Sequence, residues 1–523
     1  MERQTGRAAL APSCNEVPEW LGRWRARAPA FFERYLELDP RSLGLARIYL
    51  GIVLLLEAVR RIPYVELFYT DDGLLPRAAV RHDTREPLVS LFFFAPHALE
   101  ASIVLGACAI VFALFTLGVR TRIVHPLAFL AILGMHARTP LFEDGSENTV
   151  RLLTFWTMFL PLGACFSFDA RRRDVPERRP AVSVAVAAVL LQLAVVYALN
   201  VAHKHGAGWR DGSAVHYVLH QDRIVTWLGL QLRPHMTPAL SAVLTWGTLV
   251  VEAALPVLLL TPLRTAAARR LAVVLGIGLH GTFLLTMNLG MISAAMIGFF
   301  LLLVPTRDWD ALARVPWLRG ALGPPRGEAE AEDASARTRT GWRSWGPTTR
   351  ELLVLLFGLA LGLRVFRDNG LPRALRLRAL PAALSALGDY PRLFQTWSMF
   401  APDAPLVDSH VFVDAITKDG RHIDPLNAVG SRVATTPLSA IPERLGLDEL
   451  FCDYGFGIAT HTAFHGALRD WIFRHAERTG DPRDRIESFT VWTIEDTSPP
   501  PGENEPTAVR LRVVLRAERG GAR

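Results

Sequence analysis

The chain has 523 residues, of which 50% are hydrophobic, and its formal net charge is +7. A mean hydropathy of +0.22, with the apolar residues gathered in long blocks, excludes an ordinary soluble protein. Basic residues cluster at the ends of these blocks, which favours contact with lipid and argues against nucleic-acid binding. None of the four cysteines lies in a CxxC pair, which argues against a disulfide framework or a zinc site. They are Cys14, Cys108, Cys165 and Cys452.

The first 40 residues (1–40) are polar and rich in arginine. Within them, "WLGRWRARAPAFFERYLEL" predicts an amphipathic helix that lies on the cytoplasmic membrane surface. The segment lacks a short apolar core followed by a small-residue cleavage site, so we expect no removable signal peptide.

Nine apolar runs then follow as candidate membrane spans, since about 20 apolar residues are needed to cross a bilayer. Eight of them fall within residues 41–305, and the ninth covers residues 350–367. The third contains His125 and Pro126 and is one of the two shortest. The nine candidates are 43–61, 98–118, 122–138, 150–168, 181–203, 239–262, 270–287, 289–305 and 350–367.

Loop charge predicts the orientation of these spans. Three short loops, 120–122, 170–180 and 263–270, are basic, whereas loop 139–148 is acidic. The positive-inside rule places the basic loops and the amino terminus in the cytoplasm. Nine spans then put the carboxy-terminal region outside, although several arginines that follow the ninth span run against the rule. We expect a bacterial inner-membrane protein whose carboxy-terminal domain is periplasmic.

The soluble segments differ in character. Residues 306–349 predict a cytoplasmic loop that is partly disordered, because its centre is rich in Pro, Gly and charge. Residues 389–520 predict a small α+β domain. The runs "HVFVDAIT", "SFTVWTIED" and "AVRLRVVLRA" alternate apolar and polar residues as half-buried strands do. "TAFHGALRDWIFRHAE" predicts an amphipathic helix. The predicted fold is thus an α-helical membrane protein of about nine spans with a small carboxy-terminal α+β domain.

Polar residues inside the apolar runs are candidate functional groups, because ionisable side chains are costly in a membrane. Glu252 and His280 each lie near the middle of a span, and Arg151 begins one. Glu252 either forms a structural ion pair, with Arg151 as one candidate partner, or lines a polar active cavity. His280 is either a neutral imidazole between helices or a catalytic group.

Lys204 follows a long apolar run and is flanked by two histidines, one of them His205. A lysine at the end of a span is commonly an anchor in the interface. Here a glycine-rich turn with Trp209 follows at once, and "SAVHYVLHQDRIVTWLGLQL" predicts an amphipathic helix that covers the cluster. A lysine in such a pocket loses solvation, which favours a neutral amine that can act as a general base.

Two histidine pairs have the i, i+4 spacing of metal ligands: His216 with His220, and His461 with His465. Neither pair has an evident third ligand, so we expect no metal site.

Five segments resemble signatures of the HTTM-type membrane domain, which is shared with the vitamin K-dependent gamma-carboxylase. They are "FYTDDGLLPR", "RLLTFWTMFLPLGACFSFDA", "VYALNVAHKHGAGWRDGSAVHY", "LHGTFLLTMNLGMISAAM" and "QTWSMFAPDAP". The resemblance covers most of residues 40–310. It includes the five-residue spacing from Lys204 to Trp209 and the ten-residue spacing from His280 to Gly290.

The resemblance implies that Lys204 deprotonates vitamin K hydroquinone (menaquinol) and that His280 assists as a second catalytic residue. The hydroquinone then reacts with oxygen and becomes an epoxide, a glutamyl γ-proton is removed, and CO2 adds. Trp209, His205, Glu252 and Arg151 are the candidate residues around the cofactor. One family histidine is absent, since its neighbourhood here reads "DGSEN" (144–148).

Two hypotheses of different class remain open. In the first, the chain is a quinol-oxygenating lyase that carboxylates a peptide or protein substrate on the outer side. Alternatively, it is a non-catalytic membrane protein whose outer domain binds a periplasmic partner. Transport is a weaker third hypothesis, because the chain has no evident inverted repeat.

Overall fold

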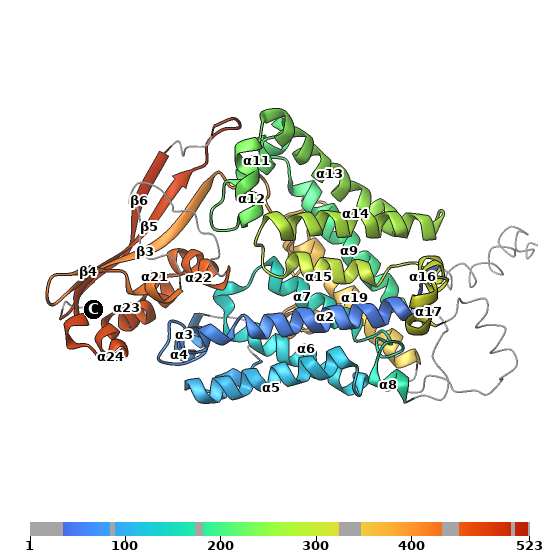
Figure 1. The fold of residues 1–523 in the computed structure, drawn as a ribbon, viewed down its shortest axis with the longest axis horizontal. Helices are drawn as coiled ribbons and strands as arrows, with labels where there is room; N and C mark the ends of the chain where they lie inside the picture. The colour runs from blue at the N-terminus through green and yellow to red at the C-terminus, as the bar shows by residue number, and fades with distance from the viewer. Residues whose placement is uncertain are drawn as a thin grey trace, which may run out of the picture.

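The computed structural model describes six ranges of the chain: 35–83, 89–172, 181–323, 347–430, 449–503 and 508–520. Most of the predicted amino-terminal helix (20–38) and the centre of the loop 306–349 lie outside these ranges. The described residues form a bundle of long helices, with a sheet and several short helices packed at one end (Figure 1).

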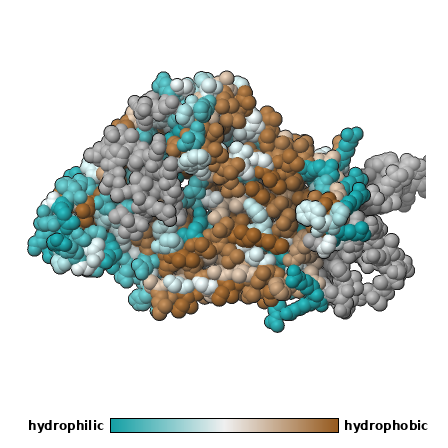
Figure 2. Space-filling view, viewed as in Figure 1, coloured by the Kyte–Doolittle hydropathy of each residue, from teal (hydrophilic) through white to brown (hydrophobic). Residues whose placement is uncertain are grey.

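In Figure 1, some of the long helices of the bundle lie near the horizontal direction and others slope across it. Most of these helices are mainly apolar, and the bundle presents a hydrophobic band between two hydrophilic ends (Figure 2). In chain order they are α2 (Pro40–Val59), α5 (Ala98–Leu117), α6 (Thr121–Arg138), α7 (Gly145–Thr157), α9 (Val184–His203), α13 (Pro238–Leu260), α14 (Thr265–Thr286), α15 (Ile292–Leu301) and α19 (Pro347–Asp368).

The prediction of nine spans is not confirmed. Five helical segments among the described residues are long and apolar enough to cross a membrane. The predicted fourth span is wrong in extent, because α7 has only 13 residues and ends at Thr157. The predicted eighth span is also short, because α15 has 10 residues and meets α16 (Thr306–Ala313) at a bend of 79°. The five segments are Pro40–Phe68, Ala98–Leu117, Val184–His203, Pro238–Leu260 and Thr265–Thr286.

Short elements close both ends of the bundle. At the end away from the carboxy-terminal sheet, β1 (Glu37–Leu38) pairs with β2 (Ala181–Val182). The other short elements at that end are α8 (Phe168–Arg171), α16 and α17 (Pro316–Leu322). Those at the sheet end are η1 (Ile62–Tyr64), α3 (Val65–Phe68), α4 (Arg77–Asp83), η2 (Leu91–Phe94), η3 (Pro140–Phe142), α10 (Ala207–Asp211), α11 (Ala214–Leu219), α12 (Trp227–Leu232) and η4 (Arg233–His235).

The single helix predicted over residues 213–232 is wrong. The chain forms two short helices there, α11 and α12, because residues 220–226 leave the helix to contact the loop after α14. In that contact the amide of Asn288 donates to the carbonyl of Ile224.

The three predicted strands are confirmed within a four-stranded antiparallel sheet of order β4-β3-β5-β6. The strands are β3 (Val407–Thr417), β4 (His422–Ile423), β5 (Ile486–Thr497) and β6 (Ala508–Glu518). The predicted helix at residues 462–477 is broken into three pieces. The helical elements of this region are α20 (Ala382–Asp389), α21 (Pro425–Gly430), α22 (Glu449–Thr460), η5 (Thr462–Phe464), α23 (His465–Phe473), α24 (His475–Thr479) and η6 (Pro482–Asp484).

Candidate functional site at the sheet end of the bundle

Lys204 and Glu252 form a buried ion pair. Lys204 is the residue at which α9 ends, so its side chain is held at the edge of the apolar band. Its Nζ donates to both carboxylate oxygens of Glu252, at 2.8 and 2.6 Å. Glu252 comes from the middle of α13, and the two side chains are only 4% and 8% exposed. The proposed structural partner of Glu252, Arg151, is therefore wrong.

Trp209, in the turn after α9, packs against this ion pair. Its ring centroid lies 4.6 Å from Nζ of Lys204, close enough for a cation–π interaction. The indole Nε1 donates to the carbonyl oxygen of Phe400 at 2.8 Å, which fixes the ring plane. The structure thus brings Lys204 into contact with the tryptophan five residues later.

Residues 392–405, here called the strap, lie against this site. The amide of Gly206 donates to the carbonyl of Pro402 at 2.7 Å, and the amide of Gly208 donates to Asp403 Oδ1 at 2.9 Å. Deeper in the bundle, the amides of Gln395 and Gln192 exchange two hydrogen bonds of 3.0 and 3.1 Å. The strap therefore covers the turn after Lys204 and also enters the helical bundle.

His280 lies beside the ion pair with partners that the sequence did not reveal. Its Nε2 is 2.7 Å from the hydroxyl of Tyr197, and its Nδ1 is 3.4 Å from Oγ of Ser293. The charge of Lys204 acts on His280, and that of Glu252 acts on Tyr197. Tyr197 lies seven residues before Lys204, two turns back along α9, a spacing that could have identified it.

Two predicted cofactor residues lie elsewhere. His205 is exposed, so the structure does not bring it to the ion pair. Arg151 is buried in a separate network, in which its Nη2 lies 2.5 Å from Oε1 of Glu143 and its Nη1 lies 3.0 Å from Nδ1 of His136. Its Nε donates to the carbonyl of Arg392, so this arginine fixes the beginning of the strap.

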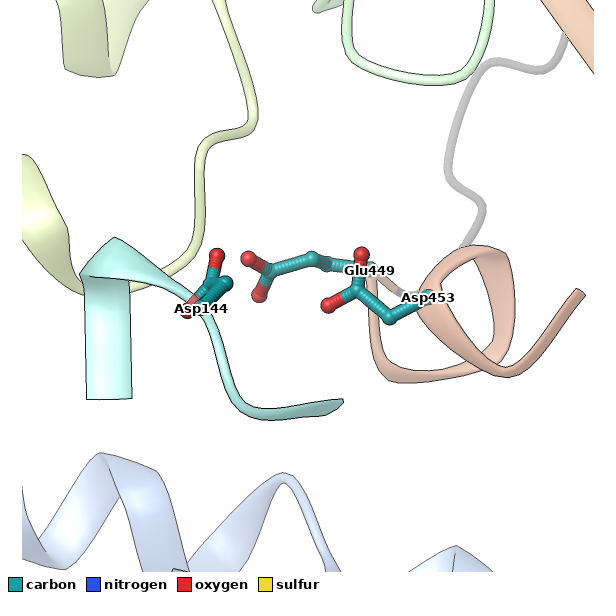
Figure 3. Close-up of side chains that lie close together, drawn as sticks. All are labelled: Asp144, Glu449 and Asp453. Carbon is teal, nitrogen blue, oxygen red and sulfur yellow. The ribbon is translucent and has the colours of Figure 1, made fainter. Parts of the chain in front are cut away.

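A cluster of three carboxylates lies where the sheet region meets the bundle. Asp144 precedes α7, while Glu449 and Asp453 come from one turn of α22 (Figure 3). One oxygen of each lies within 4.8 Å of the others, a spacing at which the three could share one metal ion. The four-residue spacing of the two acids of α22 could have shown that they share a helix face. It gave no sign that Asp144 joins them.

The charges around this cluster are only partly balanced. Nη1 of Arg60 contacts Oε2 of Glu449 at 2.5 Å, and its Nη2 contacts Oε1 of Glu57 at 3.0 Å. Burial raises the pKa of Glu449 to about 7, against the opposing effect of Arg60. Asp144 is exposed, whereas Glu449 is buried. Burial and the neighbouring carboxylates also raise the pKa of Asp453. Glu449 and Asp453 therefore retain protons at a pH where exposed carboxylates have lost them.

The loop between α14 and α15 connects the two sites. The carboxylate of Glu449 packs against Gly290, whose φ of +61° permits this close approach. The amide of Met291 donates to Oγ of Ser146 at 2.7 Å, and Ser293 reaches His280. Gly290, which contacts the carboxylate cluster, thus lies three positions before Ser293, which contacts His280.

The two predicted histidine pairs do not gather further ligands. Nε2 of His216 lies 2.9 Å from the carbonyl of Pro499, and Nδ1 of His220 lies 2.8 Å from the carbonyl of His216. His461 and His465 contact carbonyl oxygens of α22. Within the described ranges, neither pair belongs to a group of three possible metal-ligating side chains.

Comparison with known proteins adds no relative: no family model, no curated protein and no solved structure matches this chain.

Proposed function

We propose that this protein is a membrane enzyme of the gamma-carboxylase type, in which Lys204 is the base for a hydroquinone substrate. The observation that supports the proposal is the buried Lys204–Glu252 pair, with the ring of Trp209 against the ammonium. Lys204 is one of only two lysines among the 57 basic residues, and arginine would hold the ion pair but cannot act as a base.

The side chains at this site fit a substrate that carries weakly acidic hydroxyl groups. In the proposal, Glu252 takes a proton from Lys204, and the neutral amine takes the proton of a substrate hydroxyl. The direct contact of 2.6 Å between Nζ and Oε2 is a geometry in which a proton passes without water. Tyr197 and His280 supply a second hydrogen-bonded donor and acceptor on neighbouring helices. The hydroquinone, when bound, supplies the electrons for reaction with oxygen.

The test is epoxide formation by the purified protein in lipid nanodiscs with menaquinol and oxygen, measured by mass spectrometry. We expect Lys204→Arg to abolish epoxide formation, because it keeps the positive charge but removes the base. Lys418→Arg is the matched control, because Lys418 is the other lysine and is exposed on the sheet region. If Lys204→Arg folds normally and retains epoxide formation, the proposed base is wrong.

One observation favours the alternative, a non-catalytic protein that binds a periplasmic partner. β6 is the last strand of the sheet, and three apolar side chains on it are more than a third exposed: Val509, Leu511 and Val513. An edge strand of this kind can pair with an extended peptide. Absence of epoxide from the wild-type protein with every menaquinol tested would favour this alternative.

A further inference from the structure

His203 is the last residue of α9, and it joins the end of that helix to two other segments. Its Nδ1 lies 2.8 Å from the carbonyl oxygen of Trp397, in the strap. Its Nε2 lies 2.9 Å from the carbonyl oxygen of Asn369, the residue after α19. The imidazole ring therefore connects α9, α19 and the strap at the position next to Lys204.

Both contacts of this ring are with hydrogen-bond acceptors. A backbone carbonyl oxygen can only accept, and a neutral imidazole has a single N–H. Neutral His203 would thus satisfy one contact and place a nitrogen lone pair against the other oxygen. The imidazolium form has two N–H groups and donates to both oxygens. The carboxyl end of α9 favours the same form, because the helix dipole is negative there.

The charged side chains on the elements around His203 have partners of their own. They are Lys204 with Glu252 of α13, Asp368 of α19 with Arg364 and Arg367, and Asp403 of the strap with the amide of Gly208. Within the described ranges the ring forms no ion pair with a carboxylate, so the acceptors of its two N–H groups are the two carbonyl oxygens.

Two amides of the strap donate to side chains of the bundle beside this contact. The amide of Trp397 donates to Oδ1 of Asn369, and the amide of Met399 donates to Oδ1 of Asn200, both at 2.9 Å. An asparagine side chain does not change charge, so these two hydrogen bonds do not themselves depend on pH. Protection of the two amides from hydrogen exchange therefore reports whether the strap is docked.

We propose that His203 is a positioning residue which, as an imidazolium, fastens the strap over the Lys204–Glu252 pair. Loss of the second proton turns one carbonyl contact into a repulsion, so the strap is then held less tightly. Histidine changes charge between about pH 5 and 8. Because the docked strap favours the protonated ring, fastening is complete at the acidic end of this range and weakens as the pH rises. Control of access to Lys204 by the strap rests on the proposed function, whereas the fastening itself does not.

The test is hydrogen–deuterium exchange of the full-length protein in lipid nanodiscs, read by mass spectrometry of peptides from the strap. Exchange times are adjusted so that an unprotected amide exchanges equally at about pH 5.5 and about pH 8, on the two sides of the histidine titration. We expect the protection of the Trp397 and Met399 amides to fall about tenfold at the higher pH, because one charge-assisted hydrogen bond is lost.

Three variants assign this change to one ring. His203→Arg keeps the charge and the N–H donors but does not titrate in this range, so the strap should stay protected at both pH values. His203→Gln carries no charge and should give the lower protection at both. His205→Gln is the matched control, because it removes the exposed histidine two positions away and should behave as the wild type does.

Equal protection of the wild-type strap at the two pH values would overturn the proposal. So would a pH dependence that survives in His203→Arg, because another group would then be responsible, or one that disappears in His205→Gln. These measurements use no substrate, and epoxide formation tests the base at Lys204 separately. A failure of the proposed base therefore leaves the fastening of the strap intact, and the reverse also holds.

Discussion

The Lys204–Glu252 pair leads to a prediction that does not depend on any proposed activity. Glu252→Gln removes the negative charge that faces the ammonium, and Lys204→Met removes the positive charge that faces the carboxylate. Since the side chains are only 4% and 8% exposed, water cannot replace the lost partner effectively. Each single substitution should lower the free energy of unfolding by about 3–5 kcal/mol, the usual cost of leaving one buried charge alone.

The double variant Lys204→Met/Glu252→Gln buries no unpaired charge. We therefore expect it to be more stable than the sum of the single variants implies, with a coupling energy of about 2–3 kcal/mol. The assay is denaturant unfolding of the full-length protein in mixed micelles, with all four proteins measured under identical conditions. The exposed pair Arg469–Asp470 serves as the control, because screening by water should leave it without measurable coupling.

A coupling energy below about 0.5 kcal/mol would refute this reasoning, since unconnected pairs scatter by that amount. It would mean that the ion pair is open to water or is not formed in the folded protein. A coupling of the expected size would establish the contact without reference to catalysis.

Three further predictions concern neighbouring groups. The raised pKa values at the carboxylate cluster mean that the folded protein holds protons which the unfolded chain has released. Stability should therefore fall as the pH rises from about 4 towards 7, through the titration of Glu449 and Asp453. Asp453→Asn should flatten that fall in thermal melts, and an unchanged slope would count against the cluster. Gly290→Ala places a Cβ 2.0 Å from Oε1 of Glu449 at a positive φ and should cost about 1–3 kcal/mol, whereas Gly281→Ala meets open space and should not destabilise in the same melts. Tyr197→Phe removes the 2.7 Å contact with the histidine of α14 and should cost about 1–3 kcal/mol in denaturant unfolding; an unchanged stability would argue that the bond is not formed.

Composition and periodicity were sufficient to predict the class of the fold but not the number of spans. Apolar runs identify α2, α5, α9, α13 and α14, because a lipid-facing helix needs a continuous apolar surface. The run 150–168 is equally apolar, yet the helix stops at Thr157. Every residue from Ser146 to Thr157 is buried by its neighbours. The apolar residues of this run are therefore explained by packing within the protein and not by contact with lipid.

The candidate site could be predicted only in part. The resemblance singled out Lys204 and Trp209 by their five-residue spacing, and the two side chains are in contact. The pairing of Lys204 with Glu252 depends on how α9 packs against α13, 48 residues further along the chain, which no local pattern specifies. The same limit applies to Asp144 and Glu449, which come together only when α22 docks on the bundle.

The strap changes where a soluble fragment of this protein should begin. A fragment that starts at residue 389, the predicted start of the carboxy-terminal domain, would expose Gln395 and Asp403 to water. Their hydrogen-bonding partners, Gln192 and Gly208, would stay behind in the membrane part. The structural boundary lies instead between Pro405 and β3, so expression of the sheet region alone should start at about Val407. A chimera that exchanges the sheet region between proteins should likewise leave residues 392–405 with the helices.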